Sequence, residues 1–185
     1  MVSGNDAAVA LSEFISGNVE SFAELMNLKA NELGLKSSHF VSPHGLDSDE
    51  HYTTAYDLAI LADYALKNPV FAKIVNTSNY SITINNYSKS LHNSNELLGY
   101  LDGVYGVKTG FTNGANRCLV TSCKRDNLDI ICVVLGCDTK KDRTLDSTNL
   151  INYIFNNFSV VNLKNLIEKN FEDWGKNSST KFKID

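Results

Sequence analysis

Apolar side chains in the first third of the chain recur at the spacing of an amphipathic helix. We predict one helix over residues 7–15, with Asn5 or Asp6 as its N-cap and Gly17 at its end. A second, longer helix is expected from Asn18, which is a good N-cap residue, to Gly34. The first part of the chain therefore predicts two consecutive helices.

Residues 36–53 are rich in turn formers and predict a loop, after which the helical spacing returns. A third helix is expected from Thr54 to the pair Asn68-Pro69. Pro69 suits the first turn of a short fourth helix that ends near Val75.

The period changes to two after residue 79, which indicates strands. Residues 80–84 and 87–91 alternate around Asn85-Asn86 and predict a hairpin. Further strands are expected over residues 103–110, 117–123 and 129–137. A last helix is expected over residues 140–155, with Leu145, Leu150, Ile151, Ile154 and Phe155 facing inward. This order indicates an α+β fold in which a helical part precedes an antiparallel sheet and a C-terminal helix packs on that sheet.

Composition narrows the class of protein. The 185 residues carry a formal net charge of −4 and are 43% hydrophobic, which is typical of a globular domain and lacks the basic face of a nucleic-acid binder. No stretch approaches the roughly 20 apolar residues that span a bilayer. The first residues have neither the basic nor the apolar region of a signal peptide. Processing, truncation and a cytosolic location would each give this pattern.

Four cysteines, Cys118, Cys123, Cys132 and Cys137, lie in the last two predicted strands. Their C-x4-C-x8-C-x4-C spacing lacks the close pairs of common zinc sites. Buried thiols packed within the sheet are the first expectation, because free cysteine is among the most buried residue types. A cross-strand disulfide remains open.

Two short motifs are candidates for chemistry. Lys108-Thr109-Gly110 lies on a glycine-bounded strand, where an ammonium and a hydroxyl can together bind a carboxylate. Ser3-Gly4-Asn5 opens the first helix, where a hydroxyl and an amide can face one cleft. Either motif alone is more simply explained as a strand end or a helix cap.

Together with their surroundings, these motifs resemble the serine-type D-alanyl-D-alanine carboxypeptidases, which are the low-molecular-weight penicillin-binding proteins. The similarity covers residues 2–158 and rests on five stretches in order. These are Ser3-Gly4-Asn5-Asp6-Ala7-Ala8, Ser42-Pro43-His44-Gly45-Leu46-Asp47, residues 51–59, residues 106–112 and Arg117-Cys118-Leu119-Val120. The resemblance implies a β-lactamase/transpeptidase-like fold, with a partial carboxypeptidase domain over residues 1–158 and a C-terminal extension over residues 159–185.

The sequence departs from the family pattern at the nucleophile, because no Ser-x-x-Lys motif precedes Ser3. Ser178-Ser179-Thr180-Lys181 fits that motif formally but lies in a polar tail, on the wrong side of Ser3. A second Ser-x-Asn triplet, Ser16-Gly17-Asn18, is explained as the joint between two helices. We therefore expect a fold that is incomplete at its N-terminus, as a truncated product or with the missing part on another chain.

The resemblance implies a role for each matching residue. Ser3 would relay protons, Asn5 would bind the substrate amide, and the Phe111 N–H would be one donor of the oxyanion hole. Lys108 and Thr109 would hold the terminal carboxylate, beside Gly110 and Thr112. The implied partners are peptidoglycan stem peptides ending in D-Ala-D-Ala and inhibitory β-lactams, at an extracytoplasmic location, with no cofactor and no metal. This chain alone is expected to be inactive and to form no penicillin adduct.

Alternatives and secondary features complete these expectations. A non-catalytic peptidoglycan-binding or regulatory module on the same fold is the main alternative, while a β-lactamase would need a further glutamate base.

The polar loop residues 44–51 and the basic trio Lys140, Lys141 and Arg143 are expected to be solvated. Residues 162–174 form an apolar helical stripe that is expected to pack on the domain, with a membrane surface or a partner as the other interpretations; it comprises Leu163, Leu166, Ile167, Phe171 and Trp174. Absent leading strands would leave a sheet edge uncovered and favour self-association.

Overall fold

The computed structural model describes residues 2–161 and 163–178, with residues 165 and 173–178 described by their backbone only. Its first part is helical, as predicted, with α1 (Asn5–Ser16), α2 (Val19–Glu32), α3 (Ala55–Leu66) and α4 (Pro69–Val75). Side-chain caps confirm three of the predicted starts, because the Asn18, Thr54 and Asn68 oxygens each accept a backbone N–H of the following turn. The α1 cap was predicted wrongly: Gly4 is the N-cap, so Asn5 and Asp6 lie inside the first turn.

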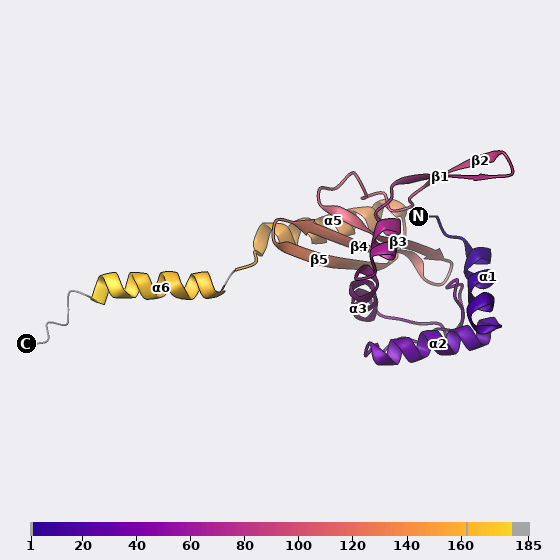
Figure 1. The fold of residues 1–185 in the computed structure, drawn as a ribbon, viewed down its shortest axis with the longest axis horizontal. Helices are drawn as coiled ribbons and strands as arrows, with labels where there is room; N and C mark the ends of the chain where they lie inside the picture. Colours follow the sequence, from indigo (N-terminus) through magenta and orange to yellow (C-terminus); the bar gives the residue numbers. More distant parts are fainter. Residues whose placement is uncertain (1, 162, 179–185) are drawn as a thin grey trace, which may run out of the picture.

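A two-stranded hairpin follows, formed by β1 (Asn79–Ile84) and β2 (Tyr87–His92), and it projects from the body of the molecule (Figure 1). Its two turn residues have positive φ, +48° at Asn85 and +65° at Asn86. Asparagine tolerates this left-handed region and the two-residue turn requires it, which explains why this pair was a reliable hairpin signal.

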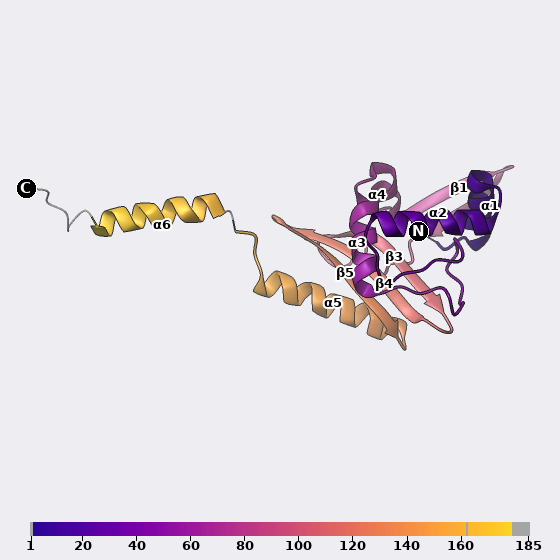
Figure 2. The same cartoon turned by 90° about the horizontal axis from the view of Figure 1, so that it is seen from below.

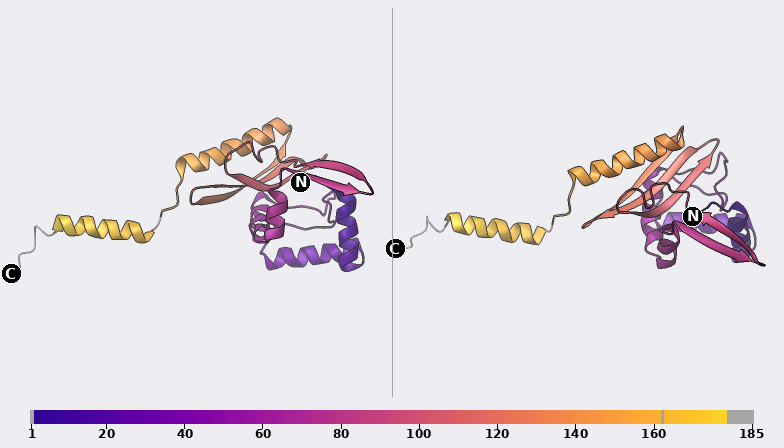
Figure 3. Two further views of the ribbon diagram at one scale, coloured as in Figure 1. Left: turned by 45° about the horizontal axis from the view of Figure 1, so that its top comes forward. Right: turned by 90° about the horizontal axis from the view of Figure 1, so that it is seen from above.

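Three longer strands form an antiparallel sheet in the order β3-β4-β5: β3 (Val104–Thr112), β4 (Asn116–Arg125) and β5 (Leu128–Cys137). The helix α5 (Lys140–Asn157) packs against one face of this sheet and α3 against the other (Figures 2 and 3). The buried core lies between the sheet and α5, and includes Leu97, Val104, Leu119, Cys123, Cys132, Val134 and Ile151. The predicted α+β architecture is thereby confirmed.

The inward face of α5 differs from the prediction. Arg143, Ser147 and Ile151 are buried at a spacing of four residues and mark the stripe that faces the sheet. Leu145 and Leu150 flank this stripe and are 51% and 49% exposed, so their predicted inward orientation is wrong. The prediction failed because it followed the apolar residues, whereas the buried stripe contains an arginine and a serine.

All four cysteines are free thiols on β4 and β5, as first expected. Cys123 and Cys132 are buried in the core, whereas Cys118 and Cys137 are partly exposed. Burial raises the pKa of the Cys132 thiol to about 11.

The last described helix is α6 (Leu163–Ser178), which stands apart from the domain (Figures 1 and 2). Its described apolar side chains at Leu163, Leu166, Ile167 and Phe171 are between 44% and 69% exposed. The expected packing on the domain is therefore wrong for these residues, because residues 158–161, which have no regular secondary structure, lead the chain away from the sheet (Figure 1). The Trp174 side chain lies outside the described residues, as do residues 179–181 of the tail Ser-x-x-Lys copy. Within the described ranges, no helix is long and apolar enough to cross a membrane.

Candidate active site

The site brings together two segments that lie 105 residues apart in the sequence. Ser3 precedes α1 and Lys108 lies on β3, and the Lys108 Nζ donates a hydrogen bond of 2.7 Å to the Ser3 Oγ. The same ammonium donates to the Thr109 carbonyl oxygen at 2.6 Å. The serine turn and the lysine strand therefore face each other directly, as the sequence motifs required.

A second cation, Arg143, influences Lys108. Arg143 of α5 is 4% exposed, and its charge adds to the effect of burial in lowering the pKa of Lys108. The Arg143 guanidinium is within 3.6 Å of the Glu96 carboxylate, which also accepts a hydrogen bond from Thr144. The expectation that Arg143 is solvated is wrong, although Lys140 and Lys141 beside it are exposed. The four-residue spacing of Arg143, Ser147 and Ile151 was the signal that could have revealed it.

The segment Asn93-Ser94-Asn95 supports β3 from its outer side and was missed in the sequence. The buried Asn95 amide donates to the Gly106 carbonyl at 2.8 Å, and its oxygen accepts the Leu97 N–H at 3.1 Å. Ser94 Oγ lies 2.6 Å from Thr109 Oγ1, so the two hydroxyls share a hydrogen bond. This loop therefore fixes both the backbone of β3 and a hydroxyl beside Lys108. Only the abundance of asparagine hinted at it.

The glycines in and beside β3 are required for different structural reasons. A Cβ at Gly103 would lie 2.3 Å from the Lys124 carbonyl oxygen, and its φ is +80°. A Cβ at Gly106 would be 3.0 Å from both Val75 and Ser122. Protein packing thus explains these two, whereas Gly110 is exposed and meets only the Cys118 Cβ at 3.7 Å. Gly110 is the position at which a ligand backbone has room to approach β3.

The loop with the polar cluster is tied to the end of the same strand. The Asp47 carboxylate accepts the Gly114 N–H at 3.0 Å, and hydrogen bonds from Thr112 and Gly114 lower the pKa of Asp47. Over the ranges that the structure describes, no three His, Cys, Asp or Glu side chains are grouped as metal ligands. Asp47 therefore has a structural partner at the β3–β4 turn.

The other predicted site residues, Asn5 and Phe111, lie close in sequence to Ser3 and Lys108. Asn5 is the first residue of α1 and is exposed, two positions after Ser3. Phe111 follows Gly110 on β3, is 55% exposed, and has the Arg117 guanidinium 4.3 Å from its ring centroid. The structure thus gives these residues positions, while their predicted roles stay predictions.

Comparison with known proteins gives the family. The sequence profile described as D-alanyl-D-alanine carboxypeptidase, peptidase S11, matches residues 1–139. The chain belongs to this family. It is 43% identical over 161 residues to the D-alanyl-D-alanine carboxypeptidase DacF of Bacillus subtilis. The family fold agrees with the β-lactamase/transpeptidase-like architecture that the motifs implied, and its members are serine-type hydrolases.

Solved structures agree with this assignment. Penicillin binding protein 5 from Haemophilus influenzae matches with a TM-score of 0.78 and 40% identity over 85% of this chain and 46% of that chain. The cefotaxime-bound penicillin-binding protein D2 of Listeria monocytogenes matches with a TM-score of 0.74 and 32% identity, over 83% of this chain and 62% of that chain. The DacF match covers 86% of this chain but 41% of DacF, so the chain spans less than half the length of that relative.

Proposed function

We propose that this chain supplies the substrate-recognition part of a D-alanyl-D-alanine carboxypeptidase site, for peptidoglycan stem peptides in the cell envelope. The observation that carries this proposal is the 2.7 Å contact between Lys108 Nζ and Ser3 Oγ, because it joins the two family motifs in one place. The nucleophile of such a site comes from a Ser-x-x-Lys motif, which these residues do not contain ahead of Ser3.

Electrostatics favours an anionic substrate terminus at this position. Burial and repulsion by the charge of Arg143, which also faces the Glu96 carboxylate, both lower the pKa of Lys108. A bound carboxylate offsets that repulsion and accepts charge-assisted hydrogen bonds. The Thr109 hydroxyl, which shares a hydrogen bond with Ser94, adds a further hydrogen bond to that carboxylate. A free C-terminal D-alanine therefore fits the charge of the site.

The remaining roles follow from the reaction. The terminal carboxylate lies against Lys108 and Thr109, while Asn5 binds the penultimate amide. The Phe111 N–H faces the developing oxyanion as one of two donors. Ser3, hydrogen-bonded to Lys108, relays a proton to the leaving D-alanine nitrogen, receiving one from the lysine of the Ser-x-x-Lys motif as it gives up its own. Removing one oxyanion donor costs about 10²–10³ in rate in a serine protease, so a part of the site alone is a poor catalyst.

Peptide titration tests the recognition claim. We expect addition of diacetyl-L-Lys-D-Ala-D-Ala to the ¹⁵N-labelled chain to shift the amides of residues 108–111, and the C-terminally amidated peptide to shift them far less. Lys108→Met should abolish the difference, whereas Lys89→Met on the exposed hairpin should leave it intact. Equal responses to the acid and the amide would contradict carboxylate recognition.

Reaction with benzylpenicillin tests the catalytic claim. In the family reaction, a serine Oγ bonds to the β-lactam carbonyl carbon, the ring C–N bond breaks, and the proton ends on that nitrogen. The adduct therefore adds the full mass of the drug. Intact-mass measurement of this chain alone should show no such species. A stable adduct would mean that these 185 residues carry their own nucleophile.

A further inference from the structure

Two of the four histidines in the chain accept a hydrogen bond from the backbone of the loop between α2 and α3. The Val41 N–H donates to the His51 Nδ1 at 3.2 Å. In the same loop, the Leu46 N–H donates to the His44 Nδ1 at 3.1 Å. A backbone N–H can only donate, so both Nδ1 atoms carry a lone pair and both imidazoles are neutral, with their proton on Nε2. These two hydrogen bonds therefore exist only while the two rings are unprotonated.

The other two histidines use Nδ1 in the opposite way. The His39 Nδ1 lies 2.6 Å from the Glu50 carbonyl oxygen, which can only accept, so this nitrogen carries a proton. The His92 Nδ1 on the hairpin donates to the Asn79 Oδ1 at 2.6 Å. An imidazolium donates from both nitrogens, so protonation leaves these two hydrogen bonds intact. Acidification therefore breaks the first pair of hydrogen bonds and spares the second.

The surroundings of His51 favour its neutral form. Burial lowers the pKa of His51 from its ordinary 6.5, and the charges of His44 and His39 lower it further. Neutral groups also contact the two rings: the Phe40 ring meets His51 edge-on at 5.7 Å between centroids, and the Ser42 hydroxyl lies 3.2 Å from the His44 Nδ1. The stability that neutral His51 contributes is thus complete above pH 6.5 and is lost as the pH falls below it.

The elements around this loop carry further polar and charged groups. The α2 helix contributes the uncharged Asn27 amide, which exchanges hydrogen bonds with the loop backbone. The α3 helix contributes the Asp57 carboxylate, which accepts from the Ser38 hydroxyl at 2.7 Å. On the loop itself, the Asp49 and Glu50 side chains are exposed. The charged groups that shift the His51 pKa are the neighbouring histidines and not these carboxylates.

The same loop is joined to the end of β3. Backbone hydrogen bonds between His39 and Tyr52, of 2.8 and 3.0 Å, close the base of the loop without any side chain. At its tip, the Asp47 carboxylate accepts the Gly114 N–H at 3.0 Å. Hydrogen bonds from Thr112 and Gly114 lower the Asp47 pKa from 3.8, so Asp47 stays ionised in mild acid. Mild acid therefore reaches this contact through the histidines and not through the carboxylate.

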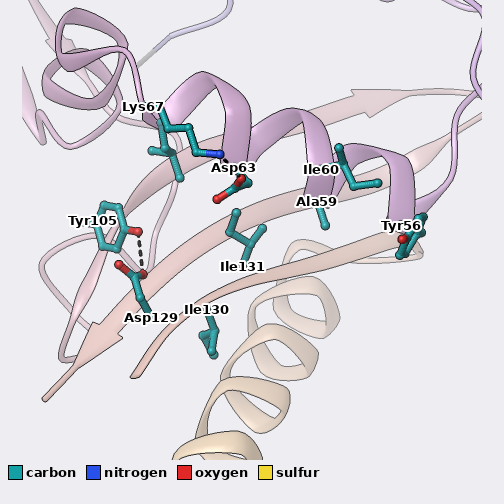
Figure 4. A pocket seen from close by; sticks show the side chains of 10 residues that line it. Tyr56, Ala59, Ile60, Asp63, Lys67, Tyr105, Asp129, Ile130 and Ile131 are labelled. Atoms are coloured by element: carbon teal, nitrogen blue, oxygen red, sulfur yellow. Dashed lines mark hydrogen bonds and ion pairs between the residues drawn. The ribbon is translucent and has the colours of Figure 1, made fainter. Parts of the chain in front are cut away.

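Two other groups with shifted pKa values do not lose their function in mild acid. Tyr105, in the pocket between α3 and the sheet, donates to the Asp129 carboxylate at 2.7 Å (Figure 4). Burial and this hydrogen bond raise the Tyr105 pKa, so the phenol stays neutral. Burial lowers the pKa of Lys108 from 10.5, and acidification can only add to the charge that binds a carboxylate.

We propose that His44 and His51 form a pH-sensitive latch, which holds residues 41–47 on the end of β3 while both rings are neutral and releases them in mild acid. Protonation puts an N–H at each Nδ1, where it faces a backbone N–H, and places two cations in one loop. Release of the loop loosens the β3–β4 turn, which follows Lys108-Thr109-Gly110. The effect on peptide recognition rests on the proposed function, whereas the latch itself is a property of the loop.

Amide hydrogen exchange in the full chain tests the latch, at about pH 7.5 and about pH 5, because this range spans the ordinary histidine pKa. Protection factors, which correct for the intrinsic pH dependence of exchange, should fall about fivefold or more at Val41, Leu46 and Gly114 in acid. Side-chain ¹⁵N NMR at the higher pH should show His44 and His51 protonated on Nε2.

The double variant His44→Asn, His51→Asn separates protonation from packing. Asparagine Oδ1 accepts a hydrogen bond but does not titrate, so the variant should keep its protection factors at both pH values. His92→Asn, at the exposed hairpin histidine, is the matched control and should respond to acid like the unmodified chain. If the double variant alters the fold, seen in its circular dichroism, exchange and ring protonation in the unmodified chain decide instead.

Undiminished protection in acid, an equal loss in the double variant, or Nδ1 protonation of His44 and His51 at the higher pH would each overturn the latch. The peptide-induced shifts of residues 108–111 should shrink in acid in the unmodified chain and not in the double variant. Equal shifts at both pH values would contradict the link to the site. Absence of a peptide response at either pH would count against the proposed function alone, because the latch is measured without peptide.

Discussion

Replacing Asn95 by alanine should destabilise the domain and loosen the strand that carries Lys108. Asn95 is 2% exposed, and its amide joins two backbone groups: it donates to the Gly106 carbonyl and accepts the Leu97 N–H. Gly106 lies two residues before Lys108, so this side chain anchors β3 at the site. Alanine leaves a carbonyl and an N–H without partners in a buried place.

The magnitude follows from these two bonds. A buried polar group that loses its partner costs about 1–3 kcal/mol, and two such groups are affected, so we expect a loss of roughly 2–6 kcal/mol in the free energy of unfolding. This is a large fraction of the 5–15 kcal/mol that is typical of a domain. Urea denaturation followed by circular dichroism measures it. The peptide-induced amide shifts at residues 108–111 should also become smaller.

A surface asparagine provides the control for this experiment. Asn157 is exposed and donates a single hydrogen bond to the Tyr153 carbonyl, so Asn157→Ala should change stability by less than about 0.5 kcal/mol. If Asn95→Ala is no more destabilising than Asn157→Ala, then the loop 93–95 does not hold β3 in the way the structure indicates.

Three further predictions concern the core, the thiols and the C-terminal helix. Ile151→Ala should cost about 2–5 kcal/mol because Ile151 is fully buried, whereas Leu150→Ala, at a half-exposed neighbouring position, should cost less than about 1 kcal/mol in the same urea assay. Burial raises the pKa of Cys132 from an ordinary 9.0 to about 11, so the stability contributed by the protonated thiol is complete below pH 9 and is lost as the pH rises toward 11. Cys132→Val should therefore flatten the plot of unfolding free energy against pH between pH 9 and 11. An unchanged slope in this variant would contradict the prediction. Removing residues 159–185 should leave the unfolding free energy unchanged, since the described apolar side chains of α6 are exposed. Co-sedimentation with lipid vesicles, with and without this segment, then tests whether α6 binds a membrane surface or a protein partner.

Local signals predicted most of the secondary structure. The caps at Asn18, Thr54 and Asn68, the left-handed turn at Asn85-Asn86 and the apolar runs of β4 and β5 are each decided by residues a few positions apart. The predictions that failed are those that depend on tertiary packing. Burial of Arg143 depends on which face of α5 meets the sheet, and the exposure of Leu145 and Leu150 follows from the same rotation. The α6 stripe has helical spacing, but nothing in that spacing says where the helix lies.

In the candidate site, too, some residues could be predicted from the sequence and others could not. The pairing of Ser3 with Lys108 was expected from two motifs of one family, because separate motifs that serve one reaction must meet in space. Ser94, Asn95 and Arg143 belong to no motif that the sequence revealed, since their importance arises from hydrogen bonds and burial formed only after folding. The family motifs therefore predicted that Ser3 and Lys108 meet, whereas the residues that support β3 beside them could not be found from the sequence.

The most direct measurement is a side-chain proton NOE between Ser3 and Lys108 in the ¹³C-labelled chain. The hydrogen bond between their hydroxyl and ammonium groups predicts a cross-peak between the Ser3 β-protons and the Lys108 ε-protons, which should vanish in Ser3→Gly. Lys108 ε-protons that show contacts only to other parts of the chain would mean that the two motifs do not form one site.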